Sequence, residues 1–283
     1  MKRFLKTVAL LAVILVLAAG SYLLGGKLAG YFGSNPGRNS GPNQVEAVEE
    51  RLGKMTLEEK VGQVIISYFN GPEFTPALAA ELQEIHPGGV ILFSHSGNIE
   101  NPDQVAAMTA QIQQWALDRG AIPLFIAVDQ EGGAVARLTE GVTVFPGNMA
   151  LGATGSEELA RLSAAVTARE LRLLGINFNF APVVDVNNNP ANPVIGVRSF
   201  GSDPDEVGRL GAAMVAPYRA EGVLATAKHF PGHGDTTVDS HYGLPLIPHD
   251  LRRLSQVELP PFQAMIDAGV PAVMVAHILM PAL

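Results

Sequence analysis

From residue 46 onward, short apolar runs alternate with longer stretches of helical periodicity. The apolar runs are rich in β-branched residues and cover residues 61–67, 88–93, 123–129, 176–183, 222–230 and 271–277. Runs of this length and composition predict buried strands. The chain therefore reads as strands that alternate with helices.

The helical stretches carry start and stop signals. Their starts combine a capping side chain with a glutamate three residues later or with a first-turn proline, and their ends are followed by glycine. The starts are Thr56–Glu59, Asn101–Pro102, Asp203–Pro204 and Ser255–Glu258, and the ends are Gly120, Gly175, Gly222 and Gly269. The start at Thr56 overlaps the first apolar run, so part of 61–67 is expected to be helical.

Strands separated by helices predict parallel βαβ units, which occur in doubly wound sheets and in (β/α)8 barrels. Polar residues follow several strands closely, at Asp129, Asp185, Lys228–His229 and His277. In a barrel these positions share one face. A dinucleotide-binding fold needs a glycine-rich turn after its first strand, and the sequence has none there. We therefore predict an α/β fold of the (β/α)8 TIM-barrel type.

A (β/α)8 barrel has eight strands, and about six are predicted here. We accordingly expect a barrel that is incomplete at its C-terminus, with its first and last strands left as unpaired edges. The alternative is that the pattern leaves some strands undetected.

The first 45 residues differ in composition from the rest. Basic residues in "MKRFLK" precede an uncharged run over residues 7–26, which at 1.5 Å per residue would reach roughly 30 Å as a helix. Residues 1–30 are therefore interpreted as an uncleaved transmembrane anchor; a cleaved signal peptide and a buried core helix are the alternatives. Residues 31–45 read as a flexible linker and residues 46–283 as the barrel domain. Either exported form gives an extracytoplasmic domain, and the anchored form makes the membrane a partner.

Charge and cysteine content exclude several functions. The first 45 residues hold five basic side chains and no acidic one, and the whole chain has a net charge of −8, so residues 46–283 carry −13. An acidic domain is a poor ligand for nucleic acid, and none is expected as a partner. The absence of cysteine rules out disulfides, thiolate metal sites and a cysteine nucleophile.

The segment "KHFPGHGDTTVDSHYG", residues 228–243, concentrates titratable groups after a predicted strand. Asp239 and His241 are two residues apart, and a carboxylate beside an imidazole fixes its tautomer and raises its basicity. Such a pair can act as a general acid and base, although a polar turn could also use both side chains for its own hydrogen bonds. Lys228 and His229 could donate to an oxygen-rich ligand, or Lys228 could form a structural ion pair.

A metal site is the alternative interpretation of this segment. Its histidines and aspartates could coordinate a divalent cation. They are His229, His233, Asp235, Asp239 and His241. Barrel metal sites draw ligands from several strands, however, and the first predicted strand has no His-x-His pair. We therefore expect no metal and no other cofactor.

Two further segments offer groups for binding a polar ligand. Asp129 ends a strand before the glycine pair in "VDQEGG", and Arg137 follows eight residues later. Arg198 lies among small residues in "VIGVRSF". These side chains could bind sugar hydroxyls; equally, Asp129 could cap a helix and Arg198 could lie on the surface.

The segments together resemble the bacterial β-N-acetylhexosaminidases of glycoside hydrolase family 3. The resemblance rests on "MTLEEKVGQ", "GGVILF", "VDQEGG", "NFNFAPVVDV", "RSFGSDP", "KHFPGHGDTTVDSH" and "ELPPFQAMIDAGVPAVMVAH", in the family's order over residues 47–282. It implies a (β/α)8 domain that removes terminal β-linked N-acetylglucosamine from cell-wall-derived glycans with retention. It further implies that Asp239 and His241 form the acid/base pair. The residues implied to hold the sugar are Asp129, Arg137, Arg198, Lys228 and His229.

The resemblance also implies a carboxylate nucleophile, which a retaining mechanism requires. In the family this aspartate follows the segment "MVAHILMPAL", where the present sequence ends. We therefore expect little hydrolysis from these residues alone. Ala134 also departs from the family, which usually has arginine there. A sugar-binding remnant without turnover and a metal-dependent hydrolase on the same barrel are the rival functions.

Overall fold

Six parallel strands form the centre of the fold. The computed structural model describes residues 42–282, and its strands there are β1 (Ile66–Tyr68), β2 (Gly89–Leu92), β3 (Phe125–Val128), β4 (Phe178–Asn179), β5 (Thr226–Phe230) and β6 (Ala272–Val275). β1 to β4 pair in that order, and β5 pairs with β6. A parallel bridge joins Phe178 of β4 to Leu224, just before β5. The strands therefore follow one another in chain order.

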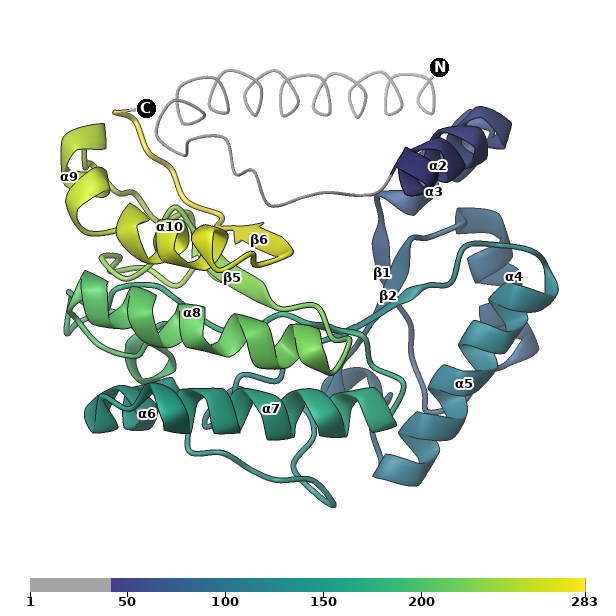
Figure 1. The fold of residues 1–283 in the computed structure, drawn as a ribbon, viewed down its shortest axis with the longest axis horizontal. Helices are drawn as coiled ribbons and strands as arrows, with labels where there is room; N and C mark the ends of the chain where they lie inside the picture. The colour runs from purple at the N-terminus through teal and green to yellow at the C-terminus, as the bar shows by residue number, and fades with distance from the viewer. Residues whose placement is uncertain (1–41, 283) are drawn as a thin grey trace. The chain divides into compact units, whose positions relative to one another are not determined.

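This order decides between the two α/β architectures that the sequence left open. A doubly wound sheet reverses its strand order at a switch point, whereas a barrel adds each strand beside the previous one. The strands run from β1 to β6 without reversal, and helices lie outside them (Figure 1). The predicted α/β fold of the TIM-barrel type is thus supported, with six strands in the described residues.

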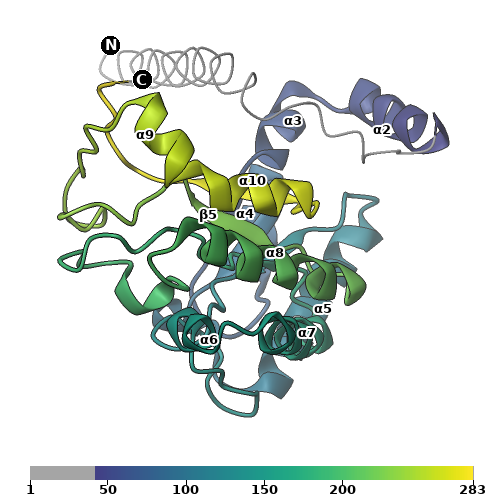
Figure 2. The same cartoon turned by 60° about the vertical axis from the view of Figure 1, so that its left-hand side comes forward.

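Helices connect the successive strands. The long ones are α4 (Pro76–Ile85), α5 (Pro102–Asp118), α7 (Glu157–Leu173), α8 (Pro204–Ala220) and α10 (Leu259–Asp267), and the others are α2 (Pro42–Lys54), α3 (Leu57–Gln63), α6 (Asn148–Thr154) and α9 (Leu251–Gln256). α8 packs between α7 and α10, and the three lie side by side in Figure 2. Leu210 of α8 and Phe262 of α10 are completely buried, and the Phe262 ring contacts that of Phe230 on β5. Burial of each such side chain contributes about 1.5–3 kcal/mol.

Most predicted helix boundaries are confirmed. The side chains of Thr56, Asn101 and Asp203 accept hydrogen bonds from first-turn amides of α3, α5 and α8. The predicted start at Ser255 is wrong, because Ser255 lies inside α9 and its hydroxyl donates to the carbonyl of Arg252. Asp250 caps α9 instead. The Asp250 carboxylate accepts the amide of Arg253 and so caps α9 in place of the predicted Ser255.

The first apolar run is mostly helical, as its overlapping cap indicated. α3 extends to Gln63, and β1 contains only three residues. β1 and β6 stand at the two ends of the strand order, and Tyr68 and Val275 on them are exposed by 58% and 65%. The sequence predicted such edge strands.

The predicted N-terminal segments lie largely beyond the described residues. Within residues 42–282 the structure has no helix that is both long and apolar enough to cross a bilayer. The anchor predicted for residues 1–30 lies outside this range, as do residues 31–41 of the predicted linker. α2 begins at Pro42, so helix starts four residues before the domain boundary predicted at residue 46.

Candidate active site

Polar side chains from neighbouring strands meet at the carboxyl end of the sheet. Asp129 and Glu131 follow β3, Asp185 follows β4, and Lys228 and His229 belong to β5. Because β3, β4 and β5 are neighbours in one parallel arrangement, their ends bring these groups together. Asp129, Asp185, Lys228 and His229 therefore gather as predicted, whereas His277, which follows β6, is exposed.

Lys228 is the centre of this gathering. Its Nζ lies 2.8 Å from Asp129 Oδ1 and 2.6 Å from Glu131 Oε1. The Lys228 side chain is 2% exposed and that of Glu131 is also 2% exposed. A buried ammonium needs such partners because an unpaired charge there would be very unfavourable. Lys228 is thus locked between two carboxylates.

Arg198 binds the other side of Glu131. It ends the short 3₁₀ helix η2 (Gly196–Arg198), and its Nε and Nη2 donate to Glu131 Oε2 and Oε1, each at 2.8 Å. Burial alone raises the pKa of Glu131, but the Lys228 and Arg198 cations outweigh burial and leave that pKa below its usual value. Sequence reasoning missed Glu131, although it stands in the quoted "VDQEGG" motif. The cluster of Asp129, Glu131, Arg137, Arg198 and Lys228 is called the Lys228 cluster below.

Arg137 is the loosest member of the Lys228 cluster. Its Nη2 is 3.8 Å from Asp129 Oδ2, and the two side chains are 30% and 17% exposed. The inner residues are almost inaccessible to solvent. An incoming ligand would therefore meet Asp129 and Arg137 first.

His229 is held by Asp185 rather than by the Lys228 cluster. Its Nδ1 is 2.7 Å from Asp185 Oδ2, its backbone amide donates to Asp185 Oδ1 at 3.1 Å, and its Nε2 is 3.4 Å from Arg198 Nη2. Asp185 is completely buried. Burial by itself raises the pKa of Asp185, but the His229 contacts and the His233 amide overcome this and lower it. The sequence marked Asp185 as a strand-end residue without assigning it to the site.

The predicted Asp239–His241 pair forms, on an exposed loop. His241 Nδ1 is 2.6 Å from Asp239 Oδ1, and the same oxygen accepts the His241 amide at 2.9 Å. Hydrogen bonds from the His241 amide and ring lower the pKa of Asp239. The His241 side chain is 74% exposed, and no hydrogen bond or ion pair among residues 42–282 joins the pair directly to the Lys228 cluster. The five predicted sugar-binding residues are thus contiguous, whereas the pair stands apart from them.

Comparison with known proteins decides the family. Residues 56–283 match the model of the glycosyl hydrolase family 3 N terminal domain. The chain belongs to glycosyl hydrolase family 3. This confirms the resemblance read from the sequence motifs.

Several similar proteins are named as hexosaminidases or N-acetylglucosaminidases. This family 3 domain is 48% identical over 214 residues to beta-hexosaminidase A from Pseudoalteromonas piscicida, a match that covers 74% of this chain and 36% of that protein. A family 3 β-N-acetylglucosaminidase from Paenibacillus shares 53% identity and a TM-score of 0.78, over 81% of this chain and 43% of that one. NagZ from Neisseria gonorrhoeae, solved with N-trifluoroacetyl-D-glucosamine, shares 35% identity and a TM-score of 0.71, over 77% of this chain and 64% of that one. The chain thus spans about a third to two thirds of the length of these relatives.

The structure does not bring the five candidate metal ligands of the sequence together. Among the described residues, the one group with a suitable arrangement is Asp235, His249 and Glu258, whose ligand atoms lie within 4.8 Å of one another. Arg253 already places a cation there, 3.2 Å from Glu258 Oε1 and 3.8 Å from Asp235 Oδ2. His249 Nε2 is also engaged, 2.7 Å from Asp235 Oδ2. This group works as an ion-pair network of the family 3 domain.

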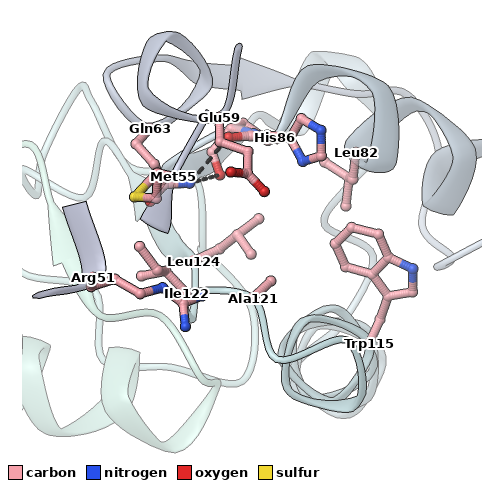
Figure 3. A pocket seen from close by; sticks show the side chains of 11 residues that line it. Arg51, Met55, Glu59, Gln63, Leu82, His86, Trp115, Ala121, Ile122 and Leu124 are labelled. Atoms are coloured by element: carbon pink, nitrogen blue, oxygen red, sulfur yellow. Dashed lines mark hydrogen bonds between the residues drawn. The ribbon is translucent and has the colours of Figure 1, made fainter. Parts of the chain in front are cut away.

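A separate pocket lies at the opposite end of the strands. Figure 3 shows its lining side chains, with Trp115 of α5 on one side and Arg51 and Met55 on the other. Two of its charged groups are engaged within the fold: Glu59 accepts the Thr56 amide within the capping box, and Arg51 donates to the carbonyl of Gly120. In barrels this end of the strands serves stability rather than chemistry. The candidate active site is therefore the strand-end cluster.

Proposed function

We propose that this family 3 domain binds terminal β-linked N-acetylglucosamine of cell-wall-derived glycans and serves its retaining hydrolysis. The observation that supports the proposal most is the Lys228 cluster, a fixed set of charged hydrogen-bonding groups at the strand ends. The names of the relatives, β-hexosaminidase and β-N-acetylglucosaminidase, point to the same sugar.

The cluster divides into groups that meet the sugar and groups that hold them. The side chains of Asp129 and Arg137 remain partly exposed, and a carboxylate and a guanidinium are suited to accept from and donate to sugar hydroxyls. His229 is 17% exposed and presents its ring at the same edge. Lys228 and Glu131 are inaccessible, so they orient Asp129 and Arg198. Such preorganisation reduces the loss of side-chain freedom on binding.

The Asp239–His241 pair is proposed to transfer the proton. Asp239 holds Nδ1 of the imidazole, which leaves Nε2 free to protonate the leaving oxygen and later to accept a proton from water. A carboxylic acid usually has this role in glycosidases, so an imidazole replaces it here. The exposed loop must bring His241 to the sugar, because the pair has no direct bond to the cluster.

The nucleophile is proposed to come from outside residues 42–282. Retention needs a carboxylate that can attack the anomeric carbon. Glu131 and Asp185 are buried in ion pairs, and Asp129 is paired with Lys228. None of these three carboxylates is available for attack without breaking its pair. The domain alone is therefore proposed to bind the sugar with little turnover.

Sugar binding and turnover can be tested separately on the 283-residue protein. Calorimetric titration with N-acetylglucosamine should show binding that Asp129→Asn weakens at least about tenfold, since a charge-assisted hydrogen bond is worth about 1.5–3 kcal/mol. Asp267→Asn on the far helix α10 is the matched control and should change nothing. Release of nitrophenol from its N-acetylglucosaminide should be negligible. Absent binding would refute the sugar proposal, and robust turnover would refute the proposal on the nucleophile.

The same titration addresses the rival functions. A metal-dependent hydrolase would lose sugar binding when a chelator removes its metal and would gain activity when metal is added. Sugar binding at the proposed site should not change in the presence of a chelator. Binding without cleavage in a protein extended to the full length of its relatives would favour a sugar-binding module.

We also propose that the domain is exported and tethered to the membrane by residues 1–30, with the barrel on the extracytoplasmic side. The basic residues before an uncharged run support this orientation. Fractionation and N-terminal sequencing test it: the intact N-terminus should be recovered with membranes. Recovery of a shortened soluble form would indicate a cleaved signal peptide.

A further inference from the structure

His233 is a buried histidine that the proposed chemistry does not use. It is 2% exposed and lies in the turn after β5. Its backbone amide donates to Asp185 Oδ1 at 2.6 Å, its Nδ1 lies 2.8 Å from Thr236 Oγ1, and its Nε2 lies 3.1 Å from Ser240 Oγ. Every polar atom of the ring therefore has a specific partner.

The donors and acceptors around His233 determine its tautomer. The Thr236 hydroxyl has one proton, and it donates this proton to the carbonyl of His233 at 3.1 Å. The two hydrogens of Asn192 Nδ2 go to the carbonyls of His233 and Gly234, at 2.8 and 2.9 Å, so Asn192 does not decide the direction of the Thr236 hydroxyl. With its own proton on the His233 carbonyl, Thr236 Oγ1 accepts from the ring, which places the hydrogen on Nδ1.

The other ring nitrogen then has to be an acceptor. Burial lowers the pKa of His233, so the ring is neutral near pH 7 and its Nε2 has a free lone pair. The Ser240 hydroxyl is the group within reach, and it donates to that lone pair. The Ser240 hydroxyl is therefore oriented toward His233 Nε2, and the His233 ring is itself held by a hydrogen bond at each of its two nitrogens.

Ser240 stands between the two residues of the proposed proton-transfer pair. The amides of Tyr242 and Gly243 donate to the carbonyl of Asp239. These two hydrogen bonds therefore lie within the loop and do not attach it to the rest of the fold. Among the described residues, the bond between Ser240 and His233 is the one hydrogen bond that ties residues 237–243 to the rest of the fold. The Tyr242 side chain is 91% exposed, so packing of that ring holds the loop weakly.

We infer that His233 is a positioning residue: as the Nδ1–H tautomer it accepts the hydrogen of the Ser240 hydroxyl and thereby ties the loop that carries Asp239 and His241 to the turn after β5. Asp185 links this arrangement to the sugar side, since its Oδ1 accepts the amides of both His229 and His233. A role of His233 in catalysis rests on the proposed function. The tautomer of His233 and its bond to Ser240 do not depend on that proposal.

Nitrogen-15 spectra of the histidine rings of the full 283-residue protein test the inference without sugar or turnover. At pH 7 His233 should show a protonated Nδ1 and an unprotonated Nε2. Thr236→Val removes the acceptor of Nδ1 and should convert the ring to the Nε2–H tautomer. An Nε2–H tautomer in the unaltered protein would overturn the inference.

Hydrogen exchange of the loop amides provides the second measurement. Ser240→Ala should speed exchange at His241, Tyr242 and Gly243 about tenfold, in line with the loss of one hydrogen bond. Ser240→Thr keeps the hydroxyl and should retain slow exchange. Ser240 is only half-buried, so both variants should fold with unchanged thermal stability. Equal exchange in the alanine and threonine variants would overturn the inference, whatever the sugar titration shows.

Discussion

Replacing Lys228 by methionine tests whether the Lys228 cluster is a stabilised charge network. Methionine keeps most of the length and volume of the side chain and removes the ammonium, so the change in free energy of unfolding reports mainly on charge. The ammonium lies 2.6 Å from Glu131 and 2.8 Å from Asp129, in a site that is almost closed to water.

The structure indicates the size of the loss. Removing one partner of a buried pair costs about 3–5 kcal/mol, because the other charge remains buried. Glu131 keeps its two bonds to Arg198, and Asp129 keeps some solvent contact. Because of both effects, we expect Lys228→Met to lower the free energy of unfolding by about 3 kcal/mol, the lower end of that range. Glu131→Gln should remove much of that penalty, so the double variant should be at least about 1 kcal/mol more stable than additivity predicts.

Urea unfolding at pH 7, followed by circular dichroism, measures these differences. With a slope of about 3 kcal/mol per molar urea, Lys228→Met should lower the midpoint by about 1 M. Lys60→Met, at an exposed position of α3, is the matched control and should shift stability by less than about 0.5 kcal/mol. A loss below about 1 kcal/mol, or strict additivity in the double variant, would refute the argument that a desolvated charge pair holds the site together.

Two further predictions concern pH and the turn after β5. Burial lowers the pKa of His233, the Lys228 and Arg198 cations lower that of Glu131, and contacts with His229 and the His233 amide lower that of Asp185. All three groups therefore bind more protons in the unfolded state, and the free energy of unfolding should decrease as the pH is lowered. Urea midpoints should decline below about pH 6.5 as unfolded histidine gains its proton, and more steeply below about pH 4.5; a flat profile would contradict these assignments. Gly234→Ala should cost more than about 2 kcal/mol of thermal stability, because its Cβ would lie 1.7 Å from the carbonyl oxygen of Val186. Gly222→Ala, which meets no neighbour but has φ +73°, should cost only about 1 kcal/mol.

The sequence predicted the fold well because strand and helix signals are local. The β-branched runs gave β2, β3, β5 and β6 almost at their observed positions, and Asn101 and Asp203 marked real helix starts. The helix that extends to Gln63 was also expected, from the capping box at Thr56. The predicted start at Ser255 failed because Asp250, three residues before Arg253, caps α9 instead.

The residues of the site were easier to predict than their pairing. Asp129, Lys228 and His229 stood out as polar groups at strand ends, and a strand end is visible in a sequence. Which carboxylate would meet which cation depended on strand neighbours. Lys228 of β5 reaches Asp129, which is 99 residues earlier, because β3 and β5 are the two neighbours of β4 and their carboxyl ends lie on one face. Glu131 was missed because its role is to neutralise two buried cations, and nothing local to its motif indicates that role.

Donor and acceptor directions explain why position 185 holds a carboxylate. Oδ1 accepts the amides of His229 and His233, and Oδ2 accepts the Nδ1–H of His229. An asparagine that kept its oxygen toward the two amides would point its NH₂ group at His229 Nδ1. The ring would then have to move its hydrogen to Nε2, which lies 3.4 Å from a nitrogen of Arg198 that can only donate. The opposite orientation would direct NH₂ at two backbone donors. A group with acceptors on both sides meets all these demands, so one buried carboxylate after β4 fixes both the histidine at the proposed sugar site and the turn that leads to the Asp239–His241 pair.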